Sequence, residues 1–217
     1  MSAATVAPGL APEDRALVAW QLGREPRDVS GVAVRCPFGR PAVIETRPVL
    51  RGAPNPTLLY LTCPYLVNVV SRVEAGGGVR ALKAVFTSDE SVRRALLELT
   101  RAYQERRALL AEARVSGDES APGDQETLRD GGMPNGATSH DGVARDLSEA
   151  GIGGPSDPSK ASCLHAYAAA LLAVRSGWLP PMAGVEVVWE RLGLPATANW
   201  CDDDRCISRR DKAGELR

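Results

Sequence analysis

Short apolar segments bounded by turn residues dominate the chain between residues 31 and 62. Residues 31–35, 41–46 and 57–62 are rich in β-branched and other apolar side chains, and Pro and Gly residues separate them. This pattern is typical of β-strands joined by turns. Because the connections are too short for parallel crossovers, the pattern predicts a three-stranded antiparallel meander.

In the rest of the chain, apolar residues recur at helical spacing. Pro12 and Pro64 are each well placed as the first residue of a helix, and the cluster at residues 87–90 is typical of the start of a long one. Glycines follow several of these segments, where helices commonly end. The expected helices cover residues 12–23, 64–75, 79–86, 87–115, 160–176 and 184–193.

The order of these elements predicts an α+β fold, with a small three-stranded antiparallel sheet packed against several helices, one of them long. Residues 116–159 are rich in Gly, Ser, Asp and Pro, so we expect a disordered insertion there. The predicted organisation is a disordered tail at 1–11, a single domain at 12–193 interrupted by the insertion, and a polar tail at 194–217.

Composition narrows the function classes. The chain has 217 residues, 44% hydrophobic content and a net charge of −1, which fits one domain with its own core and gives no global field for nucleic acid. A nucleic-acid partner is therefore not expected.

The first residues lack a signal-peptide pattern, and the longest apolar run, residues 166–174, is too short to span a membrane. Together with five irregularly spaced cysteines, which indicate reduced thiols, these features predict a cytoplasmic protein.

Three cysteines and a histidine lie at the ends of predicted elements. In an antiparallel meander, Cys36 after the first strand and Cys63 after the third lie at the same edge of the sheet, and Cys163 and His165 open a later helix. Such a set is able to hold zinc, or an iron-sulfur cluster through its thiolates. Residues two apart on a helix point about 200° apart, so Cys163 or His165 would have to lie in the non-helical cap to share an ion.

Other interpretations of these residues stay open. The thiols are equally typical of small buried apolar residues, or of reactive thiolates where Cys63 and Cys163 fall at helix N-termini. Alternatively, Arg35 and Arg40 flank Cys36 beside the N-terminus of the helix that begins at Pro64. Two guanidinium groups and unpaired N–H groups are suited to a phosphate or carboxylate.

The motifs RCPFGRPAV at residues 35–43, PTLLYLTCP at 56–64 and CLHA at 163–166 occur in an order that resembles an uncharacterised bacterial family catalogued as domain of unknown function 501. The resemblance runs from about residue 31 to about residue 184 and implies no activity, substrate or cofactor. It also implies departures, because Thr100 and Ala170 stand where we expect the family to carry histidines. The chain thus resembles a diverged member.

Two classes of function follow. The first is a non-catalytic or partner-binding protein whose Cys36, Cys63, Cys163 and His165 are structural or metal-bound. The second is a small enzyme or ligand-binding protein that holds an anion with Arg35, Arg40 and the helix N-terminus at Pro64. The expected partner is accordingly a protein or a small anionic ligand, and whether the protein is an enzyme stays open.

Overall fold

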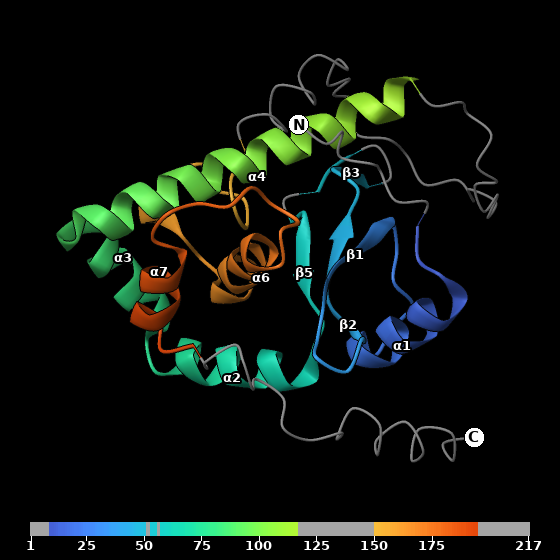
Figure 1. Ribbon diagram of the computed structural model, residues 1–217, viewed down its shortest axis with the longest axis horizontal. Coiled ribbons are helices and arrows are strands. Elements are labelled where there is room, and N and C mark those ends of the chain that lie inside the picture. Colours follow the sequence, from blue (N-terminus) through green and yellow to red (C-terminus); the bar gives the residue numbers. More distant parts are fainter. Residues whose placement is uncertain (1–8, 51–52, 56, 117–149, 195–217) are drawn as a thin grey trace, which may run out of the picture.

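Strands β1 (Val29–Arg35), β2 (Pro41–Thr46) and β5 (Leu59–Leu61) form an antiparallel sheet in the order β1-β2-β5 (Figure 1). This computed structural model describes residues 9–50, 53–55, 57–116 and 150–194. The sheet confirms the predicted meander. Its central strand, β2, is buried along its whole length because elements cover both of its faces.

A short hairpin occupies the connection between β2 and β5. Its strands, β3 (Val49–Leu50) and β4 (Ala53–Pro54), pair antiparallel. The Asn55 backbone N–H donates to the Pro48 carbonyl, and the Asn55 amide nitrogen donates to the Thr46 hydroxyl at 2.9 Å. The periodicity showed only a turn here, because strands of two residues are too short to show alternation.

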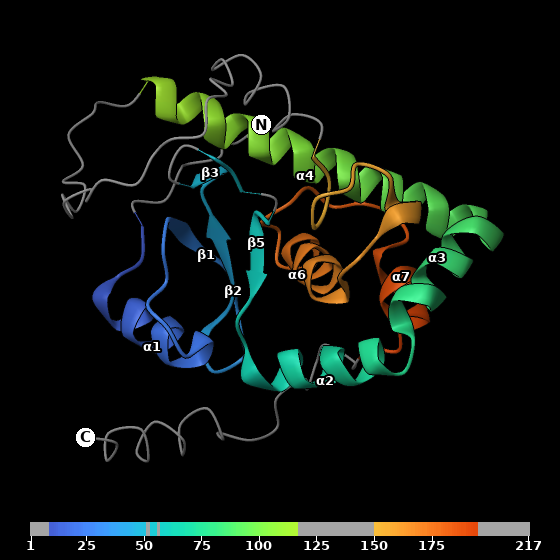
Figure 2. The same ribbon diagram turned by 180° about the vertical axis from the view of Figure 1, so that it is seen from behind.

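Helix α1 (Pro12–Leu22) covers one face of the sheet, where Val18 packs with Val29 and Ile44. The other face carries the larger core, centred on α6 (Leu164–Arg175), most of whose residues are buried. Around α6 lie α2 (Pro64–Ala75), α3 (Gly78–Ser88), the long α4 (Glu90–Ser116) and α7 (Val185–Arg191) (Figures 1 and 2). The α+β prediction, with its one long helix, is confirmed.

The apolar run at residues 166–174 is the core-facing part of α6. Its neighbours on every side are strands and helices of the same chain, including β5, α2 and α7. In the part of the chain that the structure describes, no helix combines the length and the apolar character needed to cross a bilayer.

The structure divides the predicted insertion at 116–159 into two parts. Residues 117–149 lie outside the described residues, as do the predicted tails at 1–8 and 195–217. Residues 150–159 instead belong to the packed body, where Gly151 and Gly154 form a β-bridge and Ile152 is 1% exposed. A 3-10 helix at Pro158–Lys160, capped by Asp157, then leads to α6. A single isoleucine among Gly, Ser and Pro is too sparse a pattern to predict this packing.

Candidate functional site

Cys163 and His165 lie at the N-terminus of α6, at the end of the helix nearest α2. Cys163 is the residue before the helix, with an extended backbone (φ −146°, ψ 116°), and His165 is the second residue within it. Because Cys163 is not helical, the 200° separation expected within a helix does not apply. Its Sγ lies 4.0 Å from His165 Nδ1.

Glu74 joins this pair from α2. One carboxylate oxygen, Oε2, lies 3.1 Å from His165 Nδ1, and the other, Oε1, accepts a hydrogen bond from the Leu164 backbone N–H. Glu74 therefore caps α6 from a neighbouring helix, which replaces the side-chain cap that Cys163 does not provide. Glu74 was not predicted as a site residue, since one acidic residue inside a helix carries no spacing signal.

The second nitrogen of the His165 ring, Nε2, contacts α2. His165 Nε2 lies 3.3 Å from the Val67 carbonyl and 3.1 Å from the Ser71 hydroxyl. A carbonyl oxygen only accepts, so the Nε2–H donates to Val67. When the ring is neutral, Nδ1 then carries the lone pair, which faces Glu74 and Cys163.

Electrostatics couple the three side chains. The pKa of His165 is raised to about 8, first by its contact with the Cys163 thiol and further by the charge of Glu74, against the opposing effect of burial. The pKa of the Cys163 thiol is lowered, chiefly by the hydrogen bond from His165. His165 and Glu74 are 25% and 26% exposed, so the group is open to solvent on one side. A carboxylate oxygen and a thiol sulfur thus stand beside one imidazole nitrogen at the surface.

The structure brings two of the four sequence-predicted metal ligands together and places the other two elsewhere. Among the described residues, the one group of three or more Cys, His, Asp or Glu donors within 4.8 Å of one another is Glu74, Cys163 and His165. Cys36 and Cys63 are buried in the main core. Their backbone N–H groups bond to Arg40 and Ala42 carbonyls, which places them near the same end of β2.

Of the two arginines predicted to bind an anion, Arg35 is paired with an acidic residue, whereas Arg40 is not paired with one within the described ranges. Both terminal nitrogens of Arg35 donate to the Asp14 carboxylate, at 2.9 and 2.6 Å, and this contact raises the pKa of Arg35. Pro64 is the first residue of α2, as predicted. Arg40 Nε is buried and has no hydrogen-bond partner among the described residues. An anion here would have to compete with Asp14 for Arg35.

Fold and site together define an α+β protein with a Glu/Cys/His group between two helices. The family model described as protein of unknown function (DUF501) matches residues 32–180. The chain belongs to this family, which confirms the resemblance seen in the motifs. Searches of curated proteins and of solved structures returned no match.

The matched region includes the two positions where histidines were expected. Thr100 is 4% exposed and its hydroxyl donates to the Leu96 carbonyl, and Ala170 is fully buried. In this chain both positions therefore contribute to core packing, which leaves Glu74, Cys163 and His165 as the group of potential ligands.

Proposed function

We propose that the protein binds a zinc ion through Glu74, Cys163 and His165. The observation that carries the proposal is the convergence of one oxygen, one sulfur and one nitrogen donor, all within 4.8 Å of one another, from two helices. Zinc binds thiolate, imidazole and carboxylate at about 2.0–2.3 Å. Donor atoms at these separations need only small adjustments to surround such an ion.

The donor set decides which metal fits. Iron-sulfur clusters are held mainly by several thiolates, and Cys163 is the one thiol in this group. Calcium and magnesium prefer oxygen ligands throughout. A mixed sulfur, nitrogen and oxygen set favours zinc among the common biological cations.

The orientation of His165 supports a chelating role. Metal-bound imidazoles usually donate their second N–H to a carbonyl or carboxylate, which fixes the ring. The Val67 carbonyl occupies that position, while Nδ1 is directed to Cys163 and Glu74. In a nucleophile–histidine–acid triad, by contrast, the nucleophile and the acid contact different nitrogens of the ring.

We infer that the bound ion would connect α2 to the start of α6 and keep a position open to solvent. Three protein ligands plus a water or ligand is the arrangement of catalytic rather than closed structural zinc sites. The quarter exposure of Glu74 and His165 supports this. A small anionic ligand or a donor from a protein partner would fit the fourth position. A reducing cytoplasm would keep Cys163 as a thiolate ligand.

A second candidate function rests on the same residues without metal. The lowered pKa of the Cys163 thiol and the raised pKa of His165 favour a thiolate–imidazolium pair, which is the usual condition for a nucleophilic or redox-active cysteine. The two functions exclude each other at any one moment, since a zinc-bound thiolate is shielded from alkylation.

Metal content and ligand substitution test the proposal. The full chain, purified under reducing conditions and loaded with zinc, is expected to retain one ion per molecule by elemental analysis. We expect each of the variants Glu74→Gln, Cys163→Ser and His165→Gln to weaken zinc binding by more than about 100-fold. Loss of a residue that only hydrogen-bonds to a ligand already lowers metal affinity about 10–100-fold. Glu74→Gln is informative because a glutamine oxygen still accepts from Leu164.

His140→Gln provides the matched control for the chain's other histidine, which lies outside the described residues, as do Cys201 and Cys206. If His140→Gln and a Cys201→Ser/Cys206→Ser variant both bind zinc with wild-type affinity, those residues are not ligands. The ion is then bound at the start of α6. Absence of zinc from the wild-type protein, combined with rapid alkylation of Cys163, would instead support the reactive thiol.

A further inference from the structure

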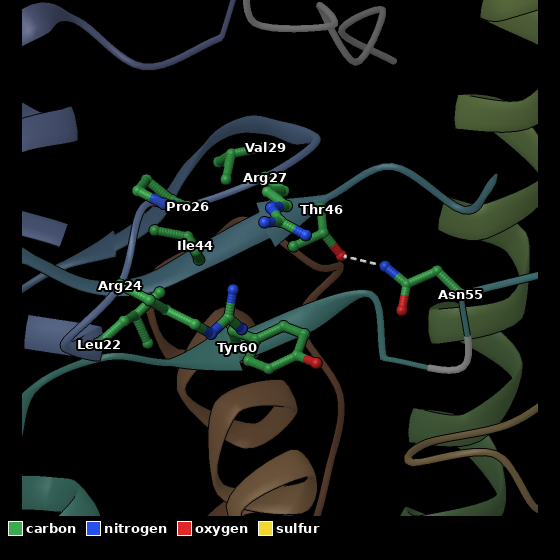
Figure 3. Close-up of a pocket in the computed structure, with 9 residues that line it drawn as sticks. All are labelled: Leu22, Arg24, Pro26, Arg27, Val29, Ile44, Thr46, Asn55 and Tyr60. Atoms are coloured by element: carbon green, nitrogen blue, oxygen red, sulfur yellow. Dashed lines mark hydrogen bonds between the residues drawn. The ribbon is translucent and has the colours of Figure 1, made fainter. Parts of the chain in front are cut away.

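A second site lies on the opposite face of the sheet, where α1 ends. A pocket of about 140 Å³ opens between the segment that follows α1 and the outer face of β2 and β5 (Figure 3). The proposed zinc ligands come from α2 and from the start of α6, and both helices lie on the far side of the sheet (Figure 1). The two sites therefore share no residue.

Two arginines give this pocket its charge. Arg24 and Arg27 both line it and are exposed, and no acidic residue is among the residues that line it. Neither guanidinium forms a hydrogen bond or an ion pair with any residue in the described part of the chain. In Figure 3, Arg24 extends toward Tyr60 and Arg27 toward Thr46. Cationic groups without partners, gathered at one cavity, favour an anionic occupant.

The floor of the pocket is apolar. Ile44 and Val29 are 2% and 6% exposed and belong to the small core under α1, against which Tyr60 packs. A cavity of about 150 Å³ with an apolar lining holds a single benzene-sized ring. The pocket is therefore suited to one ring or a short acyl chain.

The inner wall of the pocket is polar, but its side chains already form hydrogen bonds within the protein. Asn55 donates to the Thr46 hydroxyl at 2.9 Å and accepts from the Thr57 N–H at 3.2 Å, and the Thr46 hydroxyl donates to the Thr57 carbonyl at 2.7 Å. These groups hold the wall in place without requiring a ligand. Recognition must then come from the two arginines and the apolar floor.

We propose that this pocket binds a small amphipathic oxyanion, in which a carboxylate or phosphate is attached to a single ring or a short apolar chain. The oxyanion pairs with Arg24 and Arg27, since guanidinium groups match the geometry of both carboxylate and phosphate. The apolar part lies over Ile44 beside the Tyr60 ring. This site is distinct from the sequence-predicted anion site at Arg35 and Arg40, where Asp14 already neutralises Arg35.

The experiment titrates the full chain with benzoate, phenyl phosphate and neutral benzamide, followed by backbone amide NMR shifts at low salt. Ligands of this size bind weakly, so we expect a dissociation constant on the order of 1 mM for at least one anion. Benzamide should bind roughly tenfold or more weakly, because it lacks the charge that strengthens the arginine contacts. The shifted amides should include those of Ile44 and Tyr60.

Arg24→Gln and Arg27→Gln should each weaken binding of the preferred anion by roughly tenfold, the effect of one lost charged hydrogen bond. Arg94→Gln, an exposed arginine on α4, serves as the matched control and should leave binding unchanged. Equal binding of benzamide and benzoate, unchanged binding in both arginine variants, or binding of neither anion would each overturn the proposal. Tighter binding of phenyl phosphate than of benzoate would indicate that the ligand of this pocket carries a phosphate.

Discussion

Two carboxylates in this protein, Glu45 and Glu74, have opposite environments. Glu45 is fully buried on β2, and its carboxylate accepts hydrogen bonds from Arg106 Nε at 2.7 Å, Arg106 Nη2 at 2.8 Å and Trp178 Nε1 at 2.9 Å. The Ser30 hydroxyl lies 3.3 Å from the carboxylate and also donates to the Glu45 backbone carbonyl at 3.1 Å. A carboxylate offers about four lone-pair positions, so the fold already occupies nearly all of them.

Glu74 is a quarter exposed, and its Oε2 is directed to a titratable imidazole beside a thiol. The Glu45 cluster holds β2, α4 and the segment after α6 together, whereas the Glu74 group leaves donor atoms available. Charge and burial alone therefore do not identify a functional carboxylate. The number of lone pairs that the fold has already filled is the better criterion.

The largest effect should come from breaking the buried cluster. Glu45→Gln places an amide N–H₂ against the guanidinium of Arg106 and leaves a buried positive charge without its counterion. The free energy of unfolding should fall by about 3–5 kcal/mol, measured by urea denaturation, while zinc affinity per folded molecule stays unchanged.

Glu25→Gln is the exposed counterpart, because Glu25 pairs with Arg15 while their side chains are 62% and 47% exposed. It should cost less than about 1 kcal/mol. A loss in Glu45→Gln as small as that would show that the buried cluster is not structural.

The second effect concerns pH. Zinc must displace the proton that His165 holds up to about pH 8. Because the pKa of this imidazole is raised, zinc affinity should fall as the pH is lowered below that value, by about tenfold or more per pH unit between roughly pH 8 and 6. Competition with a chromophoric chelator measures it. Because the Cys163 thiol also loses its proton when it binds zinc, a flat profile would remove both His165 and Cys163 from the ligand set. His140→Gln should retain the wild-type slope.

A smaller effect is expected from Gly78→Ala at the turn between α2 and α3. A Cβ atom on Gly78 would lie 2.6 Å from Leu164 Cδ1 and 2.7 Å from Val73 Cγ1. Such crowding costs about 1–3 kcal/mol, and it should also weaken zinc binding, since Leu164 lies between Cys163 and His165. Thermal unfolding and zinc titration measure the two consequences.

Gly76→Ala is the matched control in the same turn, because its added Cβ would make ordinary contacts at 3.4 and 3.5 Å. Its stability should change by less than about 1 kcal/mol. If Gly78→Ala behaved in the same way, the close packing of the turn on Leu164 would have no energetic role.

Much of the fold could be predicted because its signals are local. Pro64 begins α2, Gly and Pro residues separate the strands, and the antiparallel order of the meander follows from connections too short for parallel crossovers. The register shifts between β1 and β2 were not predicted. The site could be predicted only in part. Cys163 and His165 were visible as neighbours at a helix start, but Cys36 and Cys63 share the same residue type and lie in the core. Spacing does not distinguish a buried thiol from a ligand.

Periodicity, turn residues and motifs act over short distances, so they were sufficient to predict the three main strands, the helices around them and the family to which the chain belongs. They placed the start of the helix that carries His165 at residue 160, whereas α6 begins at Leu164. Packing between elements brings Glu74 to Cys163 and His165, pairs Asp14 with Arg35, and places Arg24 and Arg27 at one cavity. Each of these contacts joins residues from different elements. Their meeting depends on how helices pack on the sheet, which no local pattern records.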